Sequence, residues 1–306
     1  MGFIVGFFQY TEIKTKITSV FAFLLAIAYL FQQGQPVQRL ETVVFFCSMF
    51  LFDLTTTAIN NYIDSKTNHQ ILPFSRAASL SILLALLVVS TLMGLWLVFL
   101  TDWVVLIAGG MCFMAGILYT WGPIPVSRMP LGEVVSGIFY GLLIPFLVLY
   151  INLPKESFLR VTAAWPTVSL DVNLQNFGIL ILLSMAPMFT TAGIMLANNI
   201  CDLEKDVQVG RFTLPYYMRE AALPLFAWIY YLIYPVNLFM VLAGILHPIS
   251  LLLFLTLMPV HKNIREFRRV QTKETTFLLS IQNYVIIMGA QTILIFMGGL
   301  LQGVVG

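Results

Sequence analysis

Apolar runs long enough to cross a bilayer recur along the chain, and they constrain its fold more than any other feature. A helix needs about 20 apolar residues to span the hydrocarbon core of a membrane. The runs lie at 15–33, 40–59, 77–99, 101–120, 131–152, 176–197, 221–242, 244–260 and 278–302. They are rich in Leu, Ile, Val and Phe and lack the short alternating pattern of barrel strands. The sequence therefore predicts an all-α, integral membrane bundle of nine transmembrane helices.

The composition excludes a soluble globular domain. Only 10% of the residues are charged and 59% are hydrophobic, whereas a soluble domain carries about 25% charged residues. Membrane lipid is therefore an expected partner, and no nucleic acid is expected to bind.

The basic residues are divided unequally between the two sides of the expected spans. Thirteen lie on the side of the N-terminus and three on the other. The larger set is Lys14, Lys16, Lys66, Arg76, Arg128, Lys205, Arg211, Arg219, Lys262, Arg265, Arg268, Arg269 and Lys273; the smaller set is Arg39, Lys155 and Arg160. Cytoplasmic loops carry an excess of Lys and Arg. We therefore expect a multi-pass protein of the plasma membrane whose N-terminus and active-site loops are cytoplasmic.

The longest polar connections also favour one side. They are 60–76, 121–130, 153–175, 198–219 and 261–277, and all but 153–175 lie on the expected cytoplasmic side. Function concentrates in such loops, so we expect a cytoplasmic cap over a central cavity. No long linker divides the chain, and we interpret residues 1–306 as a single domain.

An internal repeat occurs in two of these connections. Residues 60–68 (the first motif) and 198–206 (the second motif) both read Asn-Asn-x-x-Asp-x-Lys/Glu-x-Asn/Asp. Both follow even-numbered spans, so both are expected on the same side of the membrane. A parallel structural repeat would have this arrangement.

The two motifs carry oxygen ligands at helical spacing. Residues at i, i+4 and i+8 lie along one helix face, and these positions hold Asn60, Asp64 and Asn68 in the first motif and Asn198, Asp202 and Asp206 in the second. Carboxylate and amide oxygens suit Mg²⁺, which usually takes one or two carboxylates together with substrate phosphate oxygens. We predict metal ligation by Asn60, Asp64, Asn198, Asp202 and Asp206, with the three carboxylates also catalytic. A helix end with solvated polar residues is the simpler alternative for either motif alone.

Basic residues near the motifs are candidates for binding a diphosphate. Cations offset the charge that grows on such a leaving group, and the candidates are Lys66, Arg128, Lys205 and Arg211. The alternative is that these residues face anionic lipid on the cytoplasmic side. We interpret 265–273 as a solvated amphipathic face.

Asp53 lies inside the second expected span, on the same helix face as Thr57, Asn60 and Asp64. A carboxylate at this depth is costly unless it is paired or used. It either orients, or takes a proton from, a polar acceptor below the metal site, or it makes a structural hydrogen bond to a neighbouring helix. The sequence leaves these two readings open.

Several motifs resemble those of the UbiA superfamily of intramembrane prenyltransferases, over essentially the whole chain. They are the second motif with the following Gly210-Arg211-Phe212-Thr213-Leu214, and Tyr119-Thr120-Trp121-Gly122-Pro123 with Leu131-Gly132-Glu133. Within the superfamily the chain is most similar to the 1,4-dihydroxy-2-naphthoate prenyltransferases of menaquinone synthesis. The resemblance implies nine helices around a central cavity and a lateral opening for the lipid tail.

The first motif departs from the family pattern. The family usually has another acid at the position of Asn61 and a last acid at or just after Asn68, where this chain has Asn61, Asn68 and Gln70. Asp64 is therefore the only carboxylate of the first motif, which is expected to weaken metal binding there.

The resemblance implies Mg²⁺-dependent transfer of a polyprenyl group from a polyprenyl diphosphate to an aromatic acceptor. For 1,4-dihydroxy-2-naphthoate, CO₂ is lost and demethylmenaquinone forms. Tyr62 and Tyr119 are expected to shield the allylic cation, Asn199 to contact substrate, and Asp53 to be catalytic. One alternative is another acceptor: a hydroxybenzoate, a haem or a lipid phosphate. The other is a transporter or lipid-binding protein without turnover.

Overall fold

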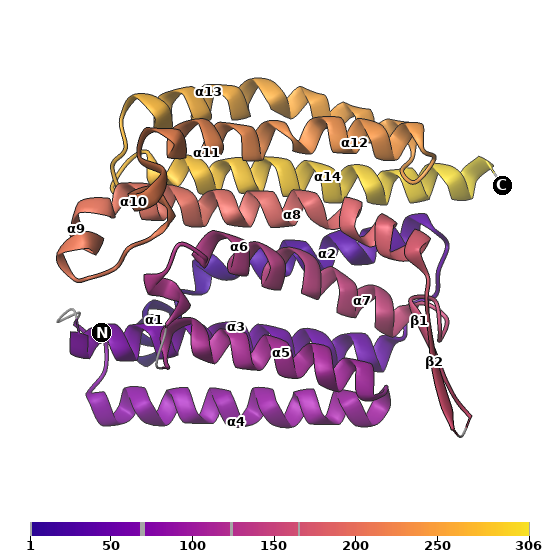
Figure 1. Ribbon diagram of the computed structural model, residues 1–306, viewed down its shortest axis with the longest axis horizontal. Helices are drawn as coiled ribbons and strands as arrows, with labels where there is room; N and C mark the ends of the chain where they lie inside the picture. Colours follow the sequence, from indigo (N-terminus) through magenta and orange to yellow (C-terminus); the bar gives the residue numbers. More distant parts are fainter. Residues whose placement is uncertain (1, 68–70, 123–124, 165, 306) are drawn as a thin grey trace.

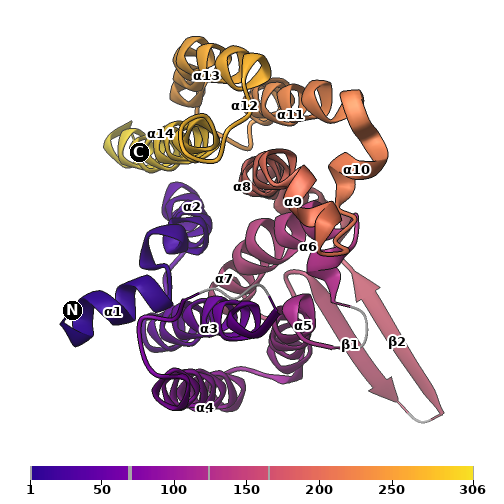
Figure 2. The same cartoon turned by 90° about the vertical axis from the view of Figure 1, so that its left-hand side faces the viewer.

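The computed structural model describes residues 2–67, 71–122, 125–164 and 166–305, and it is almost entirely helical. Long helices lie side by side, and a β-hairpin projects from one end of the bundle (Figure 1). Viewed end-on, α2 and α8 lie between a layer formed by α3, α4 and α5 and a layer formed by α11 to α14 (Figure 2).

The helical elements have the following bounds: α1 (Phe3–Tyr10), η1 (Ile13–Lys16), α2 (Ile17–Gln32), α3 (Arg39–Thr67), α4 (Arg76–Leu100), α5 (Trp103–Thr120), η2 (Val126–Arg128), α6 (Gly132–Ser136), η3 (Gly137–Leu143), α7 (Ile144–Asn152), α8 (Leu174–Cys201), α9 (Leu203–Gln208), α10 (Leu214–Met218), η4 (Arg219–Ala221), α11 (Ala222–Tyr231), α12 (Ile233–Leu242), η5 (Pro248–Thr256), α13 (Leu257–Arg269) and α14 (Phe277–Val305). Side chains cap several starts: Ser75 accepts from Ala78 N, Asp102 from Val104 N, and Asn173 from Asn176 N. Such caps satisfy backbone donors that have no partner within the helix.

Eight helical segments of the described chain are long and apolar enough to cross a membrane. They are Ile13–Gln32, Arg39–Lys66, Arg76–Leu100, Trp103–Thr120, Gly132–Asn152, Leu174–Cys201, Leu214–Leu242 and Phe277–Gly303. These segments coincide with eight of the nine expected spans. The remaining run, 244–260, contains the 3-10 helix η5 and the first turn of α13, whose later turns carry Lys262, Arg265, Arg268 and Arg269.

Two spans are interrupted where prolines remove helical hydrogen bonds. The expected span 221–242 divides into α11 and α12 at Leu232, three residues before Pro235. The expected span 131–152 begins as α6, widens into the π-helix η3 and continues as α7, with Pro145 in the first turn of α7. Isolated π-helical turns occur frequently at functional sites.

The connection 153–175, which we expected to be a loop, contains a β-hairpin. Strands β1 (Leu159–Ala164) and β2 (Thr167–Val172) pair antiparallel, with Leu159 opposite Val172 and Ala164 opposite Thr167. The hairpin lies at the opposite end of the bundle from α9 and α10 (Figure 1).

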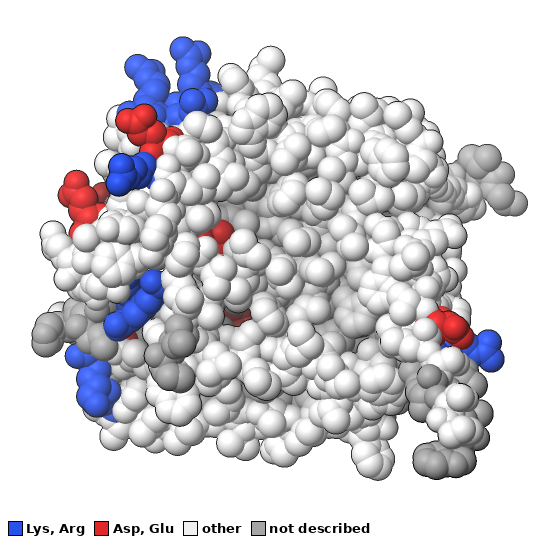
Figure 3. All heavy atoms as spheres, in the orientation of Figure 1, with Lys and Arg blue, Asp and Glu red and all other residues white. Residues whose placement is uncertain are grey.

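The outer surface is suited to lipid. Charged side chains gather at the ends of the molecule and leave a broad uncharged belt between them (Figure 3). On α4 the exposed residues include Leu84, Val88, Leu92, Trp96 and Phe99. Such an apolar belt is stable only where lipid replaces water.

The first and the last spans pack against each other and close the bundle. The Tyr284 hydroxyl on α14 donates to Thr18 O on α2 at 2.8 Å. A Cβ atom added to Gly299 would lie 2.9 Å from Gln32 Cα, so the two backbones approach closely. Small residues permit such approach between membrane helices.

Gly141 on η3 supplies another close approach, because a Cβ atom there would lie 2.2 Å from Met188 N on α8. We expect Gly141→Ala to destabilise the protein by about 3 kcal/mol, since a backbone atom cannot rotate away. The matched control is Gly109→Ala on α5, where a Cβ atom would meet nothing within 4 Å. Thermal unfolding in detergent should show a lower midpoint for Gly141→Ala alone; equal midpoints would contradict this packing.

Candidate functional site

The two motifs lie at the same end of the bundle. The first motif forms the last turns of α3, while the second spans the end of α8 and continues into α9. Helices α3 and α8 run in the same direction and end on the side where α9 and α10 lie (Figure 1). The two motifs therefore face the same side of the bundle, while the parallel repeat itself stays a prediction.

An ion pair joins the two motif regions. Arg211 Nη2 lies 2.8 Å from Asp64 Oδ1, and the side chains are 19% and 11% exposed. Arg211 is positioned by the turn after α9, where its backbone N–H donates to Asp206 O at 2.8 Å. Gly210 in this turn has φ of 73°, which glycine adopts without strain. A side chain that follows the second motif therefore reaches the carboxylate of the first.

Lys273 makes a similar contact with residues of the second motif. It lies in the connection between α13 and α14, and its Nζ is 2.5 Å from Asp202 Oδ2. The same ammonium also donates to Asn198 Oδ1. We had assigned Lys273 to a solvated face, and that prediction was wrong because the connection turns back over the end of α8.

The carboxylates of the two motifs influence one another. Burial raises the pKa of Asp206; the neighbouring Arg211 opposes this rise, and the nearby carboxylates Asp202 and Asp64 add to it. The three carboxylates thus share one electrostatic environment, which a further cation would stabilise.

The fit of these residues to Mg²⁺ depends on a second ligand. Within the described ranges, no group of three or more His, Cys, Asp or Glu side chains is arranged to hold a metal ion by itself. Arg211 Nε is buried in the same region without a hydrogen-bond partner. Few carboxylates and an unpaired cationic donor fit a site that Mg²⁺ and phosphate oxygens would complete together.

A cavity of about 560 Å³ opens beside the motifs. Asn60, Asn198, Asn199 and Arg211 line one part of it. Apolar residues of α3, α4, α5 and α7 line another part, and these include Phe45, Leu95, Val98, Val105, Leu106 and Leu147. The cavity therefore suits a molecule with an anionic head and an apolar tail.

Glu133 and Tyr119 support the wall beside the second motif. Asn199 Nδ2 donates to Glu133 Oε1 at 2.8 Å, and Glu133 is only 3% exposed. Tyr119 lines the cavity, and a Cβ atom at Gly132 would lie 3.1 Å from its hydroxyl. The segment Leu131-Gly132-Glu133 thus packs directly against two residues expected to contact substrate.

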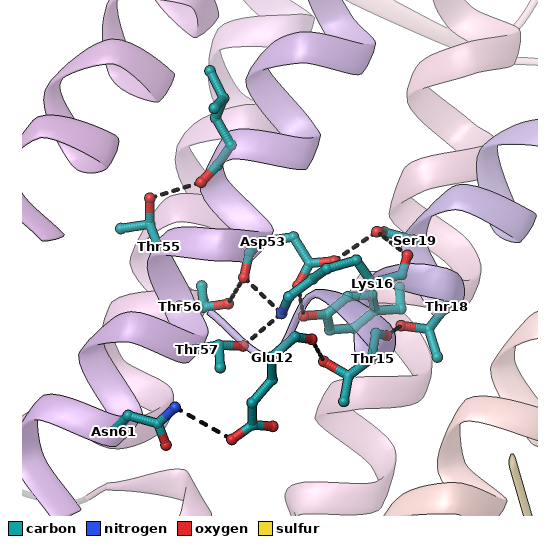
Figure 4. Close-up of polar contacts among 12 residues, drawn as sticks. Glu12, Thr15, Lys16, Thr18, Ser19, Asp53, Thr55, Thr56, Thr57 and Asn61 are labelled. Carbon is teal, nitrogen blue, oxygen red and sulfur yellow. Dashed lines mark hydrogen bonds and ion pairs between the residues drawn. The ribbon is translucent and has the colours of Figure 1, made fainter. Parts of the chain in front are cut away.

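Asp53 is buried in the cavity wall and paired with Lys16 from the N-terminal segment. Lys16 Nζ lies 2.9 Å from Asp53 Oδ1, and the two side chains are 4% and 5% exposed (Figure 4). Ser19 donates to Asp53 Oδ2 at 2.6 Å, and the Tyr140 hydroxyl donates to Oδ1 at 2.8 Å. Lys16, which we had counted among the cytoplasmic loop cations, is therefore an interior residue.

Other predicted residues are placed farther from the cavity. Lys66, Arg128 and Lys205 are all exposed. The Tyr62 ring packs under the Arg76 guanidinium, 4.4 Å from its centroid to Cζ, and it does not line the cavity described above. Asn68 and Gln70 lie outside the described residues.

Sequence reasoning missed Glu12, Lys16 and Lys273 as residues of this region. Glu12 lines the cavity and accepts from Asn61 Nδ2 at 3.2 Å (Figure 4). Its backbone is left-handed, with φ of 46°, which is uncommon for a residue other than glycine. No spacing along the chain links these residues to the motifs. Glu133 had a visible signal, because it belongs to a segment that resembles the family.

Comparison with known proteins places the chain in a family. It matches the UbiA prenyltransferase family over residues 19–282. It is 28% identical over 169 residues to a 1,4-dihydroxy-2-naphthoate octaprenyltransferase of Bacillus subtilis (strain 168). That alignment covers 55% of this chain and 48% of the relative, so the chain matches about half the length of that protein.

Solved structures share the fold across almost the whole chain. A UbiA homologue from Aeropyrum pernix K1 has a TM-score of 0.64 at 16% identity and covers 90% of this chain and 96% of its own. A UbiA homologue from Archaeoglobus fulgidus bound to GPP and Mg²⁺ has a TM-score of 0.60 at 14% identity, with coverage of 95% and 99%. A structure described for digeranylgeranylglyceryl phosphate synthase has a TM-score of 0.64 at 14% identity, with coverage of 97% and 99%.

The family match extends over most of the chain, and the shared fold agrees with it. On these grounds the chain belongs to the UbiA prenyltransferase family.

Proposed function

We propose that this protein transfers a polyprenyl group from a polyprenyl diphosphate to an aromatic acceptor in a Mg²⁺-dependent reaction. The observation that carries the proposal is the Arg211–Asp64 ion pair, which brings both motifs to one end of a cavity that is polar there and apolar beyond. A diphosphate head and an isoprenoid tail match these two environments.

The polar end would hold the diphosphate. Asn60, Asp64, Asn198, Asp202 and Asp206 would hold Mg²⁺, which when bound neutralises the diphosphate and stabilises it as a leaving group. Arg211 lies in the cavity wall with one buried donor to offer a phosphate oxygen. Lys66, Lys205 and Arg128 lie on the same side in the sequence-based topology and would add positive charge around the entrance.

The reaction then needs a shielded allylic carbon and an electron-rich ring. The allylic C–O bond breaks and its electron pair leaves with the diphosphate. The Tyr119 ring, which lines the cavity, would stabilise the cation by about 2 kcal/mol once water is excluded. Asn199, which is hydrogen-bonded to Glu133, would position the substrate. Asp53 would orient the acceptor or take a proton from it.

We propose 1,4-dihydroxy-2-naphthoate as the acceptor, with loss of CO₂ and formation of demethylmenaquinol, the reduced form of demethylmenaquinone. The support is the Bacillus subtilis relative, whose name specifies this acceptor. Incubating the protein with labelled prenyl diphosphate and a panel of naphthoate, hydroxybenzoate, haem and lipid phosphate tests the choice. Product from another acceptor alone would overturn it, and no diphosphate release with any acceptor would favour a non-catalytic membrane protein.

We further propose that residues 1–306 act as one domain in the plasma membrane with nine crossings. The segment formed by η5 and α13 would supply the crossing that is missing from the eight apolar helical segments. It would place the basic residues of α13 in the cytoplasm. The turns around α9 and α10 would form part of a cytoplasmic cap over the cavity. Accessibility of single cysteines on either side of the membrane would test this topology.

The carboxylates of the second motif should be essential for transfer. We expect Asp202→Asn and Asp206→Asn each to lower turnover about 100-fold or more, because stabilisation of the leaving group is lost. Glu204→Gln is the control, since this exposed residue of α9 lies off the line of predicted ligands. Release of labelled diphosphate measures turnover; wild-type turnover in a folded Asp202 or Asp206 variant would make the metal assignment wrong.

Lys273 should compete with a divalent cation for the second motif. We expect Lys273→Met to bind Mn²⁺ about tenfold more tightly without prenyl diphosphate, a difference of about 1.4 kcal/mol. The ammonium that contacts Asn198 and Asp202 would then be absent. Lys262→Met, which removes an exposed lysine of α13, is the matched control. Electron paramagnetic resonance of free Mn²⁺ gives the affinities, and equal values for the two variants would contradict the competition.

A further inference from the structure

A polar wall lies partway along the cavity, away from the motif end. Asp53 precedes Asn60 by seven residues, which corresponds to about 10 Å along α3. Ser19, Asp53, Thr57 and Tyr140 all line the cavity at this level. Phe45, which lies about two turns before Asp53 on α3, also lines the cavity. A group bound at this wall would therefore lie between the diphosphate and the apolar part of the cavity.

Lys16 has no hydrogen bond left to offer a ligand. An ammonium has three donors, and Lys16 directs them to Asp53 O at 2.9 Å, Asp53 Oδ1 at 2.9 Å and Thr57 Oγ1 at 2.5 Å (Figure 4). Its positive charge therefore lies directly against the Asp53 carboxyl group within the apolar bundle. A buried carboxylate without such a partner would be strongly destabilising.

Asp53, in contrast, retains one position for a donor. Each carboxylate oxygen accepts about two hydrogen bonds. Oδ1 accepts from Lys16 and Tyr140, whereas Oδ2 accepts from Ser19. One lone pair of Oδ2 thus remains in a residue that lines the cavity.

The charge of this wall selects between possible ligand groups. Lys16 and Asp53 cancel each other, and Glu12, which also lines the cavity, adds one negative charge. A ligand carboxylate here would meet like charge and no available cationic donor. A hydroxyl group would instead find a carboxyl oxygen that Lys16, Ser19 and Tyr140 hold in place.

We propose that Asp53 binds a ring hydroxyl of the aromatic acceptor and that the negative charges of Asp53 and Glu12, which both line the cavity, exclude a carboxylate from the same position. This inference rests on the proposed prenyl transfer and adds the orientation of the acceptor within the cavity. Any carboxylate of the acceptor points away from Asp53.

The hydrogen bond also assigns a path for the hydroxyl proton. As the ring carbon bonds to the allylic carbon, the electron pair of the breaking C–O bond leaves with the diphosphate. The hydroxyl proton passes to Asp53 Oδ2, which leaves a neutral keto form of the ring. Aromaticity returns when the attacked carbon loses its displaced proton to solvent or its carboxyl group as CO₂. The electron pair of that bond moves to the ring oxygen, which takes the proton back from Asp53, so that the hydroxyl and the carboxylate are both restored.

The test compares acceptors that differ in one hydroxyl hydrogen. The ligands are 1,4-dihydroxy-2-naphthoate and its two monomethyl ethers, titrated calorimetrically into the full chain in lipid nanodiscs. We expect one ether to bind wild-type protein about 10- to 100-fold more weakly, because a hydrogen bond to a charged acceptor is lost. The pair 4-hydroxybenzoate and 4-methoxybenzoate serves as a second hydroxyl probe.

The variant must remove Asp53 without leaving a buried lysine unpaired. Lys16→Met with Asp53→Leu replaces both charges by apolar side chains, an exchange that is often neutral for stability. We expect the hydroxyl and ether ligands to bind this double variant with nearly equal affinity. Ser48→Ala is the control, because Ser48 lines the cavity on α3 but bonds to Ser90 O, and it should keep the wild-type ratio.

The outcomes separate this inference from the proposed function. A double variant that keeps its unfolding midpoint and its affinity for geranyl diphosphate, but loses the preference for the hydroxyl, supports the inference. If it keeps the preference, the role of Asp53 is overturned while prenyl transfer stands. If wild-type protein neither binds nor prenylates either ring, both proposals fail. If the double variant does not fold, the variant Ser19→Ala with Tyr140→Phe replaces it in the test. This variant removes two hydrogen-bond donors from Asp53 and should change the ratio of the affinities for the hydroxyl and the ether ligand. An unchanged affinity ratio overturns the inference.

Discussion

The ion pair between Arg211 and Asp64 is the contact on which the site depends. It joins residues 147 positions apart in the chain, and it holds the end of α3 against the turn that follows α9. Without it, the first motif and the second would be two separate helix ends. With it, their oxygen atoms share one electrostatic environment beside one cavity, which is the condition for binding a single anionic head group.

A second buried pair has a different role. Lys16 and Asp53 are both almost fully enclosed, and charges are rare inside an apolar bundle unless they are paired or used. The pair fixes the N-terminal segment to α3, while Ser19 and Tyr140 complete the shell around the carboxylate. Structural pairing and contact with the cavity are therefore both present at Asp53, so the two readings left open by the sequence are compatible.

Much of the architecture followed from hydrophobic length. Eight of the nine apolar runs coincide with helices of the described structure that are long and apolar enough to cross a membrane, because about 20 apolar residues leave a chain few alternatives in lipid. The run 244–260 was harder to assign as a membrane span, because its helix continues into the basic turns of α13. The hairpin at 159–172 had a signal that went unused, because polar and apolar residues alternate from Thr167 to Val172, as in a strand with one exposed face.

The site was predictable where it repeats and unpredictable where it does not. Asn60, Asp64, Asn198, Asp202 and Asp206 were visible because their spacing occurs twice. Lys273 and Glu12 reach the same region from connections with no motif, and only the tertiary fold brings them there. Tyr62 belongs to the first motif, but its ring packs against the Arg76 guanidinium and does not line the cavity.

The pairing of α2 with α14 bears on how the molecule is made. Helix α2 has its main partner in α14, which is synthesised much later, through contacts such as Tyr284 with Thr18, 266 positions apart. During biosynthesis α2 must therefore remain covered by lipid or by the insertion machinery until α14 has been synthesised. Assembly of the bundle is thus a late event, and truncated products would present an uncovered helix face to cellular quality control.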